Sequence, residues 1–179
     1  MAMTTSNRLL DHYLVLEPDL ECVYITPDIH RMAQNDPYPT VLYREVFAAE
    51  QEGKLRVVTG KILSPSIVWR RLRGERSIVH HHFFEVRDGA SLVNVLWKTL
   101  LLTLYRMAGG TSIWTIHNAY PHQRKLMVLV GPLRRYIARI ATGLHVHCRE
   151  AVYIMSDILR LPTEKFFVVP HPVYPTVHI

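Results

Sequence analysis

SIWTIHNAYPH, residues 112–122, joins an apolar run to a cluster of polar side chains. Its first half is apolar enough to form a buried strand, and its second half contains His117, Asn118 and His122. In open parallel sheets, ligands bind at the carboxyl ends of the strands, where loops present polar groups above an apolar support. The stretch therefore predicts a buried parallel strand that delivers imidazoles and a carboxamide to a ligand-binding edge.

The rest of the chain repeats this alternation of strand and helix. Near-continuous Val, Ile and Leu runs indicate strands covered on both faces, and the helices between them indicate parallel pairing through right-handed crossovers. We therefore predict an α/β fold: one Rossmann-like domain over residues 1–179, with a doubly wound, mainly parallel sheet of about six strands and helices on both faces. The expected strands lie within 22–28, 55–60, 77–84, 111–118, 143–148 and 165–171, and the expected helices within 35–53, 64–75, 91–110, 131–141 and 149–161.

Composition and charge limit the classes to which the chain can belong. Its 179 residues are 49% hydrophobic and 20% charged, as is typical of a folded globular domain. The net charge of +6 favours an anionic partner: nucleic acid, an acidic lipid surface or a phosphorylated small molecule. The N-terminus lacks the apolar segment of a signal peptide, and Cys22 and Cys148 suit a reducing compartment. We expect a cytoplasmic protein.

Three common motifs of nucleotide-binding proteins and hydrolases are absent from the sequence. No GxGxxG follows the first expected strand, and no GxxxxGK[ST] occurs anywhere. GxSxG, the nucleophile elbow of many hydrolases, is also missing. These absences disfavour a dinucleotide-dependent dehydrogenase, a P-loop NTPase and an α/β hydrolase.

The histidines at 80–82 raise the possibility of a metal site. On a strand the first and third share one face while the second faces away, which leaves two ligands where zinc usually takes three or four. We therefore expect no metal. Two interpretations stay open: buried histidines satisfied by backbone groups, or His82 and Glu85 directed into a ligand crevice. His145 and His147 also share a strand face and are expected at the edge of the core.

Two basic stretches admit more than one interpretation. RRLRGER at 70–76 and QRKLMVLVGPLRRYIAR at 123–139 are either solvated helix faces or an amphipathic basic surface that lies on an anionic bilayer. Nucleic acid is disfavoured as a partner because neither stretch has interleaved aromatic residues for base stacking.

The motifs in this order resemble a known family. IWTIHNAYPH, the following basic helix and GLHVHCREAVYIMSDILRLPTEKFFVVPHPVY resemble the N-terminal domain of GT-B-fold glycosyltransferases, specifically the family 4-like group, whose strands end in T-[IV]-H-N and V-[IVP]-P-H. NDPYPTVLYREVFAAEQEGKLRV is similar to the N-P-Y-x-x-L-L-Y helix of a bacterial polysaccharide subset of that group. The resemblance covers roughly residues 20 to 175.

This resemblance implies the acceptor-side domain of an enzyme that moves a sugar from a nucleotide-sugar to a glycan or lipid-linked acceptor. In the family a second, C-terminal domain holds the nucleotide-sugar, and nothing in this sequence matches its donor-binding helix. The chain alone is therefore expected to be inactive. The resemblance implies no cofactor, no obligatory metal, and a place in the cytoplasm or peripherally on the inner membrane face.

Site residues carry over from the family motif by position. His117 is expected to act catalytically by holding the donor sugar at the reacting centre, supported by Asn118 and His122. If the reaction inverts the anomeric centre, Glu85 or Asp28 is the carboxylate best placed by strand topology to act as general base. A retaining reaction needs no such base.

The loop after the first strand departs from the family pattern. Residues 26–38, TPDIHRMAQNDPY, lack the glycine pair with which many relatives approach the donor phosphates. Acceptor contact by Asp36 and Tyr38 is therefore expected instead. His82 and His171 complete the substrate-binding rim at the ends of two other strands.

Two other functions remain open from the sequence. The chain is alternatively a non-catalytic α/β module that binds carbohydrate or a partner protein. Less strongly supported is a metal-dependent hydrolase that uses the histidine-rich rim.

Overall fold

The computed structural model describes residues 8–33, 37–61, 63–82, 89–119 and 127–171. Six strands form one sheet in which every pair is parallel, in the order β2-β1-β3-β4-β5-β6. The predicted fold class is confirmed, and each strand lies within its expected range. The strands are β1 (Cys22–Thr26), β2 (Arg56–Thr59), β3 (Ser77–His81), β4 (Thr111–Thr115), β5 (Gly143–Val146) and β6 (Phe166–Val168).

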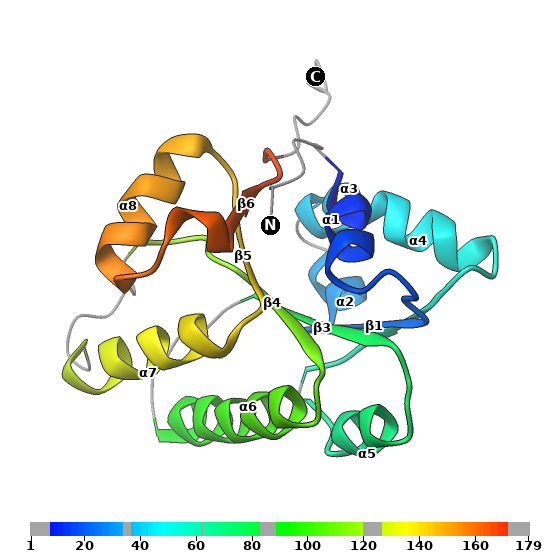
Figure 1. The fold of residues 1–179 in the computed structure, drawn as a ribbon, viewed down its shortest axis with the longest axis horizontal. Coiled ribbons are helices and arrows are strands. Elements are labelled where there is room, and N and C mark those ends of the chain that lie inside the picture. The colour runs from blue at the N-terminus through cyan, green and yellow to red at the C-terminus, as the bar shows by residue number, and fades with distance from the viewer. Residues whose placement is uncertain (1–7, 34–36, 62, 83–88, 120–126, 172–179) are drawn as a thin grey trace.

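Helices cover both faces of this sheet (Figure 1). One layer contains α1 (Leu9–Leu16), α2 (Ile29–Ala33), α3 (Tyr38–Leu42) and α4 (Arg44–Gln51). The other contains α5 (Ser66–Leu72), α6 (Gly89–Met107), α7 (Met127–Ile140) and α8 (Arg149–Leu159), and a 3-10 turn, η2 (Thr163–Lys165), precedes β6.

Each face of the sheet has its own apolar core because side chains alternate along a strand. On the α5–α8 side, Trp114, Leu144 and Phe166 belong to one cluster of buried residues. On the α1–α4 side, Ile113 and Phe167 belong to another. All five residues of β1, β3 and β4 are buried, which explains why these strands read as continuous apolar runs.

The helix expected between residues 35 and 53 differs from the structure. Its described part is two short helices, α3 and α4, which meet at Tyr43. Tyr43 departs from helical geometry, with φ −96° and ψ 7°, and its side chain is fully buried. The break follows from this burial, because the Tyr43 hydroxyl reaches His80 and His82 on the sheet. The sequence reasoning also did not identify α1 and α2.

The amino ends of the strands are joined by buried ion pairs. The Glu17 carboxylate lies 3.3 Å from Arg71 and 3.3 Å from Arg76, and it accepts a hydrogen bond of 3.0 Å from Thr111. Glu75 pairs with Arg56 and Arg70, whose side chains are more exposed, at 44% and 48%. Three arginines of the basic stretch at 70–76 therefore make ion pairs within the chain, so that stretch is not a simple solvated helix face.

Candidate functional site

The register of the sheet brings imidazoles from four neighbouring strands to its carboxyl edge. Thr115 of β4 pairs with His145 of β5, which pairs with Phe167 of β6. Because alternate residues share a face, the next row on that face continues with His117, His147 and Val169. The histidines on this face are His80 of β3 and His82 just after it, His117 after β4, His145 of β5 and His147 just after it, and His171 after β6.

Tyr38 of α3 lies at the centre of the outer histidines. Its hydroxyl is 3.2 Å from His147 Nε2. Its ring stacks on His171 with centroids 4.9 Å apart, and the ring centroids of His117, His147 and His82 lie 5.4, 5.5 and 6.3 Å away. We call Tyr38, His82, His117, His147 and His171 the histidine rim.

A chain of hydrogen bonds extends from β6 into the core beneath the rim. His145 Nε2 donates to the carbonyl oxygen of Val169 at 3.0 Å, since a carbonyl only accepts. His145 Nδ1 of a neutral ring must then accept, and it receives the Thr115 hydroxyl at 2.9 Å. Thr115 in turn accepts from His80 Nε2 at 2.6 Å. His80 Nδ1 is left as an acceptor, and the Tyr13 hydroxyl contacts it.

The same logic fixes the proton on His117. The Tyr43 hydroxyl is 2.5 Å from His82 Nε2 and 2.8 Å from His80 Nδ1, so we assign its hydrogen to His82. His82 Nδ1 then carries the ring proton and donates to His117 Nε2 at 3.0 Å. A neutral His117 that accepts at Nε2 carries its own proton on Nδ1.

Burial keeps these inner rings uncharged. It lowers the pKa of His80 and His82 well below the ordinary value, and neighbouring imidazoles lower them further. The pKa of His145 falls to about 3 for the same reason, even though its bond to Val169 acts in the opposite direction. Burial also raises the pKa of the Tyr13 and Tyr43 hydroxyls, which therefore remain protonated donors.

Asn118 is held in place by a residue that the sequence reasoning assigned to a basic surface. Arg134 of α7 is buried and donates to the Asn118 carbonyl oxygen at 2.9 Å. Its guanidinium lies 5.3 Å above the Trp114 ring of β4. Part of the basic stretch at 123–139 thus supports the carboxyl edge from within.

Asp28 lies after β1 and has a different environment from the histidine rim. Its Oδ1 accepts hydrogen bonds from Thr59 and from the backbone N–H groups of His30 and Arg31. Desolvation acts to raise the pKa of Asp28, but these bonds outweigh it and hold the pKa below its usual value. The group is therefore an ionised, hydrogen-bonded carboxylate at the start of α2.

Other expected site residues are not placed by the structure. Glu85, His122 and Asp36 lie outside the described residues. Within the described ranges, no group of three or more His, Cys, Asp or Glu side chains is arranged to hold a metal ion. His81 faces the opposite core, where its ring stacks on Trp114 with centroids 6.0 Å apart. The alternation expected for the histidines at 80–82 is confirmed.

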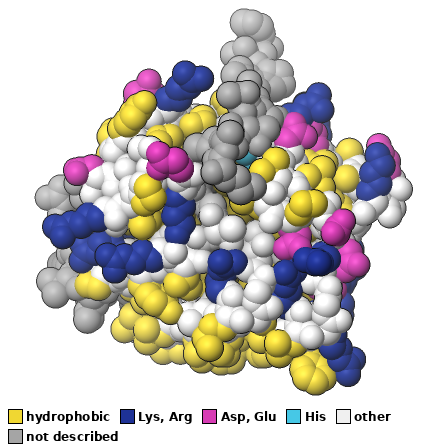
Figure 2. Space-filling view, in the orientation of Figure 1, with side chains coloured by type: hydrophobic (Ala, Val, Ile, Leu, Met, Phe, Trp, Pro, Cys, Tyr) yellow, Lys and Arg dark blue, Asp and Glu magenta, His cyan; other side chains and the backbone are white. Residues whose placement is uncertain are grey.

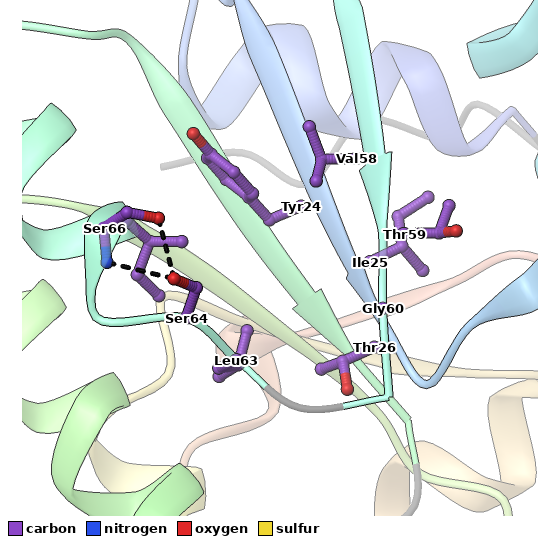
Figure 3. A pocket seen from close by; sticks show the side chains of 10 residues that line it. Tyr24, Ile25, Thr26, Val58, Thr59, Gly60, Leu63, Ser64 and Ser66 are labelled. Atoms are coloured by element: carbon purple, nitrogen blue, oxygen red, sulfur yellow. Dashed lines mark hydrogen bonds between the residues drawn. The ribbon is translucent and has the colours of Figure 1, made fainter.

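A hollow of about 210 Å³ opens at the carboxyl ends of β1 and β2. Figure 3 shows Thr26 and Thr59 at the ends of these strands, and Ser64 joined to Ser66 by hydrogen bonds at the start of α5. The lining mixes hydroxyl groups with apolar side chains, including Tyr24. The same edge of the sheet therefore contains both the histidine rim and a small hollow of mixed lining.

Several residues of the site were missed from the sequence. Tyr13, Tyr43 and Thr115 hold the buried imidazoles, and Arg134 holds Asn118. Thr115 stands two residues before His117, so strand alternation alone was enough to place it on the histidine face. The two tyrosines come from helices far away in sequence and gave no such signal.

No protein-family model, no curated protein and no solved structure matches this sequence. The resemblance to glycosyltransferases therefore depends on the motifs of the chain itself.

Proposed function

We propose that this chain is the acceptor-side domain of a glycosyltransferase that moves a sugar from a nucleotide-sugar to a glycan or lipid-linked acceptor. One observation carries the proposal: imidazoles from four successive strand ends converge on Tyr38 at the carboxyl edge of a parallel sheet. Ligands of open α/β sheets bind at that edge. The order of the motifs around His117 supports a sugar as the ligand.

The chemistry of the histidine rim suits a polyol better than a phosphate. Neutral imidazoles and a phenol offer both donors and acceptors, which match the hydroxyl groups of a sugar. A diphosphate instead favours cations or helix N-termini. The proposal therefore assigns acceptor binding to the rim and the donor's diphosphate to a second domain, as in the family that the motifs resemble.

His117 acts in this proposal as a hydrogen-bond donor. Its Nε2 is occupied by His82, so Nδ1–H is the group that it offers to a sugar oxygen. The ring positions the substrate and is not the general base. Asp28 is a weak candidate for that base because three donors already bind its Oδ1. An inverting reaction would then use Glu85, and a retaining reaction would need neither.

The proposal places the protein in the cytoplasm, with peripheral attachment to the inner membrane face. None of the helices in the described part of the chain is long and apolar enough to cross a bilayer. A basic residue of α7 that supports attachment is Arg139, which is exposed, whereas Arg134 of the same helix is buried. The arginines at 70–76 support it less, because three of them are paired within the chain.

Saturation-transfer NMR with a panel of octyl glycosides tests the proposal. At least one glycoside should give transfer signals with the unmodified chain, and His117→Ala should reduce those signals several-fold. His30→Ala is the matched control, because it removes an exposed histidine of α2 that is not part of the rim. Uridine diphosphate should bind weakly by comparison. Tight binding of the diphosphate with no signal from any glycoside would show that the rim does not serve an acceptor.

A further inference from the structure

The outward face of α6 is a continuous apolar stripe. Val93 is 67% exposed, Leu100 50% and Met107 78%. Residues 93, 97, 100, 104 and 107 follow one another at intervals of four, three, four and three, which is the spacing of a coiled-coil seam. The exposed side chains of the stripe are Val93, Leu96, Trp97, Leu100, Leu104 and Met107.

The opposite face of the same helix is already buried. Val95, Leu101 and Tyr105 pack in the α5–α8 core, so α6 is apolar on both sides. It contacts α5 and α7 on either side and is thus a central helix of its layer. Figure 2 shows hydrophobic side chains gathered along the lower edge of the molecule, where Figure 1 places α6. A large exposed apolar patch of this kind usually marks an interaction site.

The stripe has no charge, which favours a protein partner over a lipid surface. α6 is described throughout, and Lys98 and Arg106 are its only ionisable cations. Lys98 is buried, and Arg106 donates to the carbonyl oxygens of Ile140 and Gly110. A helix that binds anionic membranes carries basic residues beside its apolar face. The residues that flank this stripe are instead Asn94, Thr99 and Thr103.

We infer that α6 docks against α6 of a second copy of this chain in an antiparallel pair. The spacing is symmetric about Leu100: a two-fold axis at that residue places Val93 opposite the partner's Met107 and Leu96 opposite the partner's Leu104. An isologous dimer requires this self-complementarity. Each chain has a net charge of +6. An uncharged seam avoids placing like charges opposite each other at the contact.

The amount of apolar surface suits a small, specific interface. α6 has 19 residues, which at about 1.5 Å per residue gives a seam of roughly 28 Å. Six large side chains from each copy would remove on the order of 1,000 Å² from water, near the lower limit for specific association. Trp97 stands beside the axis, and a tryptophan in this place is a typical anchor of an interface.

Sedimentation equilibrium of the full chain tests the inference. The unmodified chain should have about twice its 20.8 kDa mass at micromolar concentration. Leu100→Glu should weaken association at least 100-fold, because two carboxylates meet at the axis. Leu100→Lys should do the same, and an equimolar mixture of the two variants should recover the dimer. Ile154→Glu on α8, which changes an exposed residue outside the stripe, should leave the mass unchanged.

Cross-linking gives an independent readout if the charged variants fail to fold. In a Cys148→Ser background, a chain with Val93→Cys and Met107→Cys should form disulfide-linked dimers on mild oxidation. A monomer at 100 μM, or dimers that Leu100→Glu leaves intact, would overturn the inference. So would a monomer that binds vesicles containing anionic phospholipid through the stripe, since the occupant would then be a membrane.

Discussion

The two ends of the sheet use polar side chains in opposite ways. At the amino end, Glu17 is buried between Arg71 and Arg76, so charge is kept and neutralised by a partner. At the carboxyl end, His80 and His145 are equally buried but lose their charge. The first arrangement uses the buried Glu17 carboxylate to hold two arginines and Thr111 together. The second keeps donors and acceptors in defined positions, which is what recognition of an uncharged ligand needs.

Acidification should cause the largest loss in the free energy of unfolding. It acts on the buried histidines at the carboxyl end of the sheet. The unfolded chain takes up protons at its histidines below about pH 6.5, whereas burial depresses the folded pKa of His80, His82 and His145. The stability from these neutral rings is complete above pH 6.5 and is lost as the pH falls. We expect the free energy of unfolding to fall by on the order of 5 kcal/mol between pH 7.5 and pH 5.

Urea unfolding at a series of pH values measures this loss. His145→Gln should remove roughly a third of this loss over the same interval, because it removes one of the three buried rings. His30→Gln, which changes an exposed histidine outside the buried network, is the matched variant for comparison. A free energy of unfolding that stays constant down to pH 5 would mean that the carboxyl end is not built from neutral rings.

Removing the acid of the amino end should have the next largest effect. Glu17→Ala leaves Arg71, whose side chain is 11% exposed, beside Arg76 with no carboxylate. Breaking a buried pair in this way typically costs about 3–5 kcal/mol. Urea unfolding at pH 7.5 measures it, with Glu52→Ala as the control because Glu52 and Lys54 form an exposed pair. Equal losses in the free energy of unfolding for Glu17→Ala and Glu52→Ala would show that the Glu17 ion pairs do not stabilise the amino end of the sheet.

Thr115→Val should weaken the carboxyl end by a smaller amount. The change leaves His80 Nε2 and His145 Nδ1 without the hydroxyl that joins them. We expect a loss of about 2 kcal/mol, because buried polar groups lose a partner while the volume is conserved. Thr99→Val is the control, since the Thr99 hydroxyl bonds the Val95 carbonyl oxygen of its own helix. A loss no greater than that of the control would disprove the relay through Thr115.

Tyr38→Phe should have the smallest effect on stability. It removes one hydroxyl, 3.2 Å from a partly exposed His147, and preserves the stacking on His171. The free energy of unfolding should change by about 1 kcal/mol or less. Under the proposed function, however, glycoside binding in the saturation-transfer experiment should fall several-fold. Unchanged binding would remove Tyr38 from the site.

The sequence was sufficient for the six strands of the sheet and for part of the site, but not for α1, α2 or the break between α3 and α4. Runs such as SIWTI and GLHV are apolar because their strands are buried on both sides, and this signal is local. Alternation likewise placed His80 and His82 on one face. Their partners were not predictable, because Tyr13 is 67 residues from His80 and Tyr43 is 37 residues away. Such contacts depend on how α1 and α4 pack on the sheet, which no local pattern encodes.

The state of the buried imidazoles can be observed directly by two-bond ¹H–¹⁵N correlation NMR of the histidine rings. The account predicts that His80, His82 and His145 stay neutral well below pH 6.5, with the ring proton on Nε2 of His80 and His145 and on Nδ1 of His82. It also predicts a neutral His117 with its proton on Nδ1 at pH 7.5. Imidazolium signals from the three buried rings that appear near pH 6.5, the ordinary value for a histidine, would contradict it.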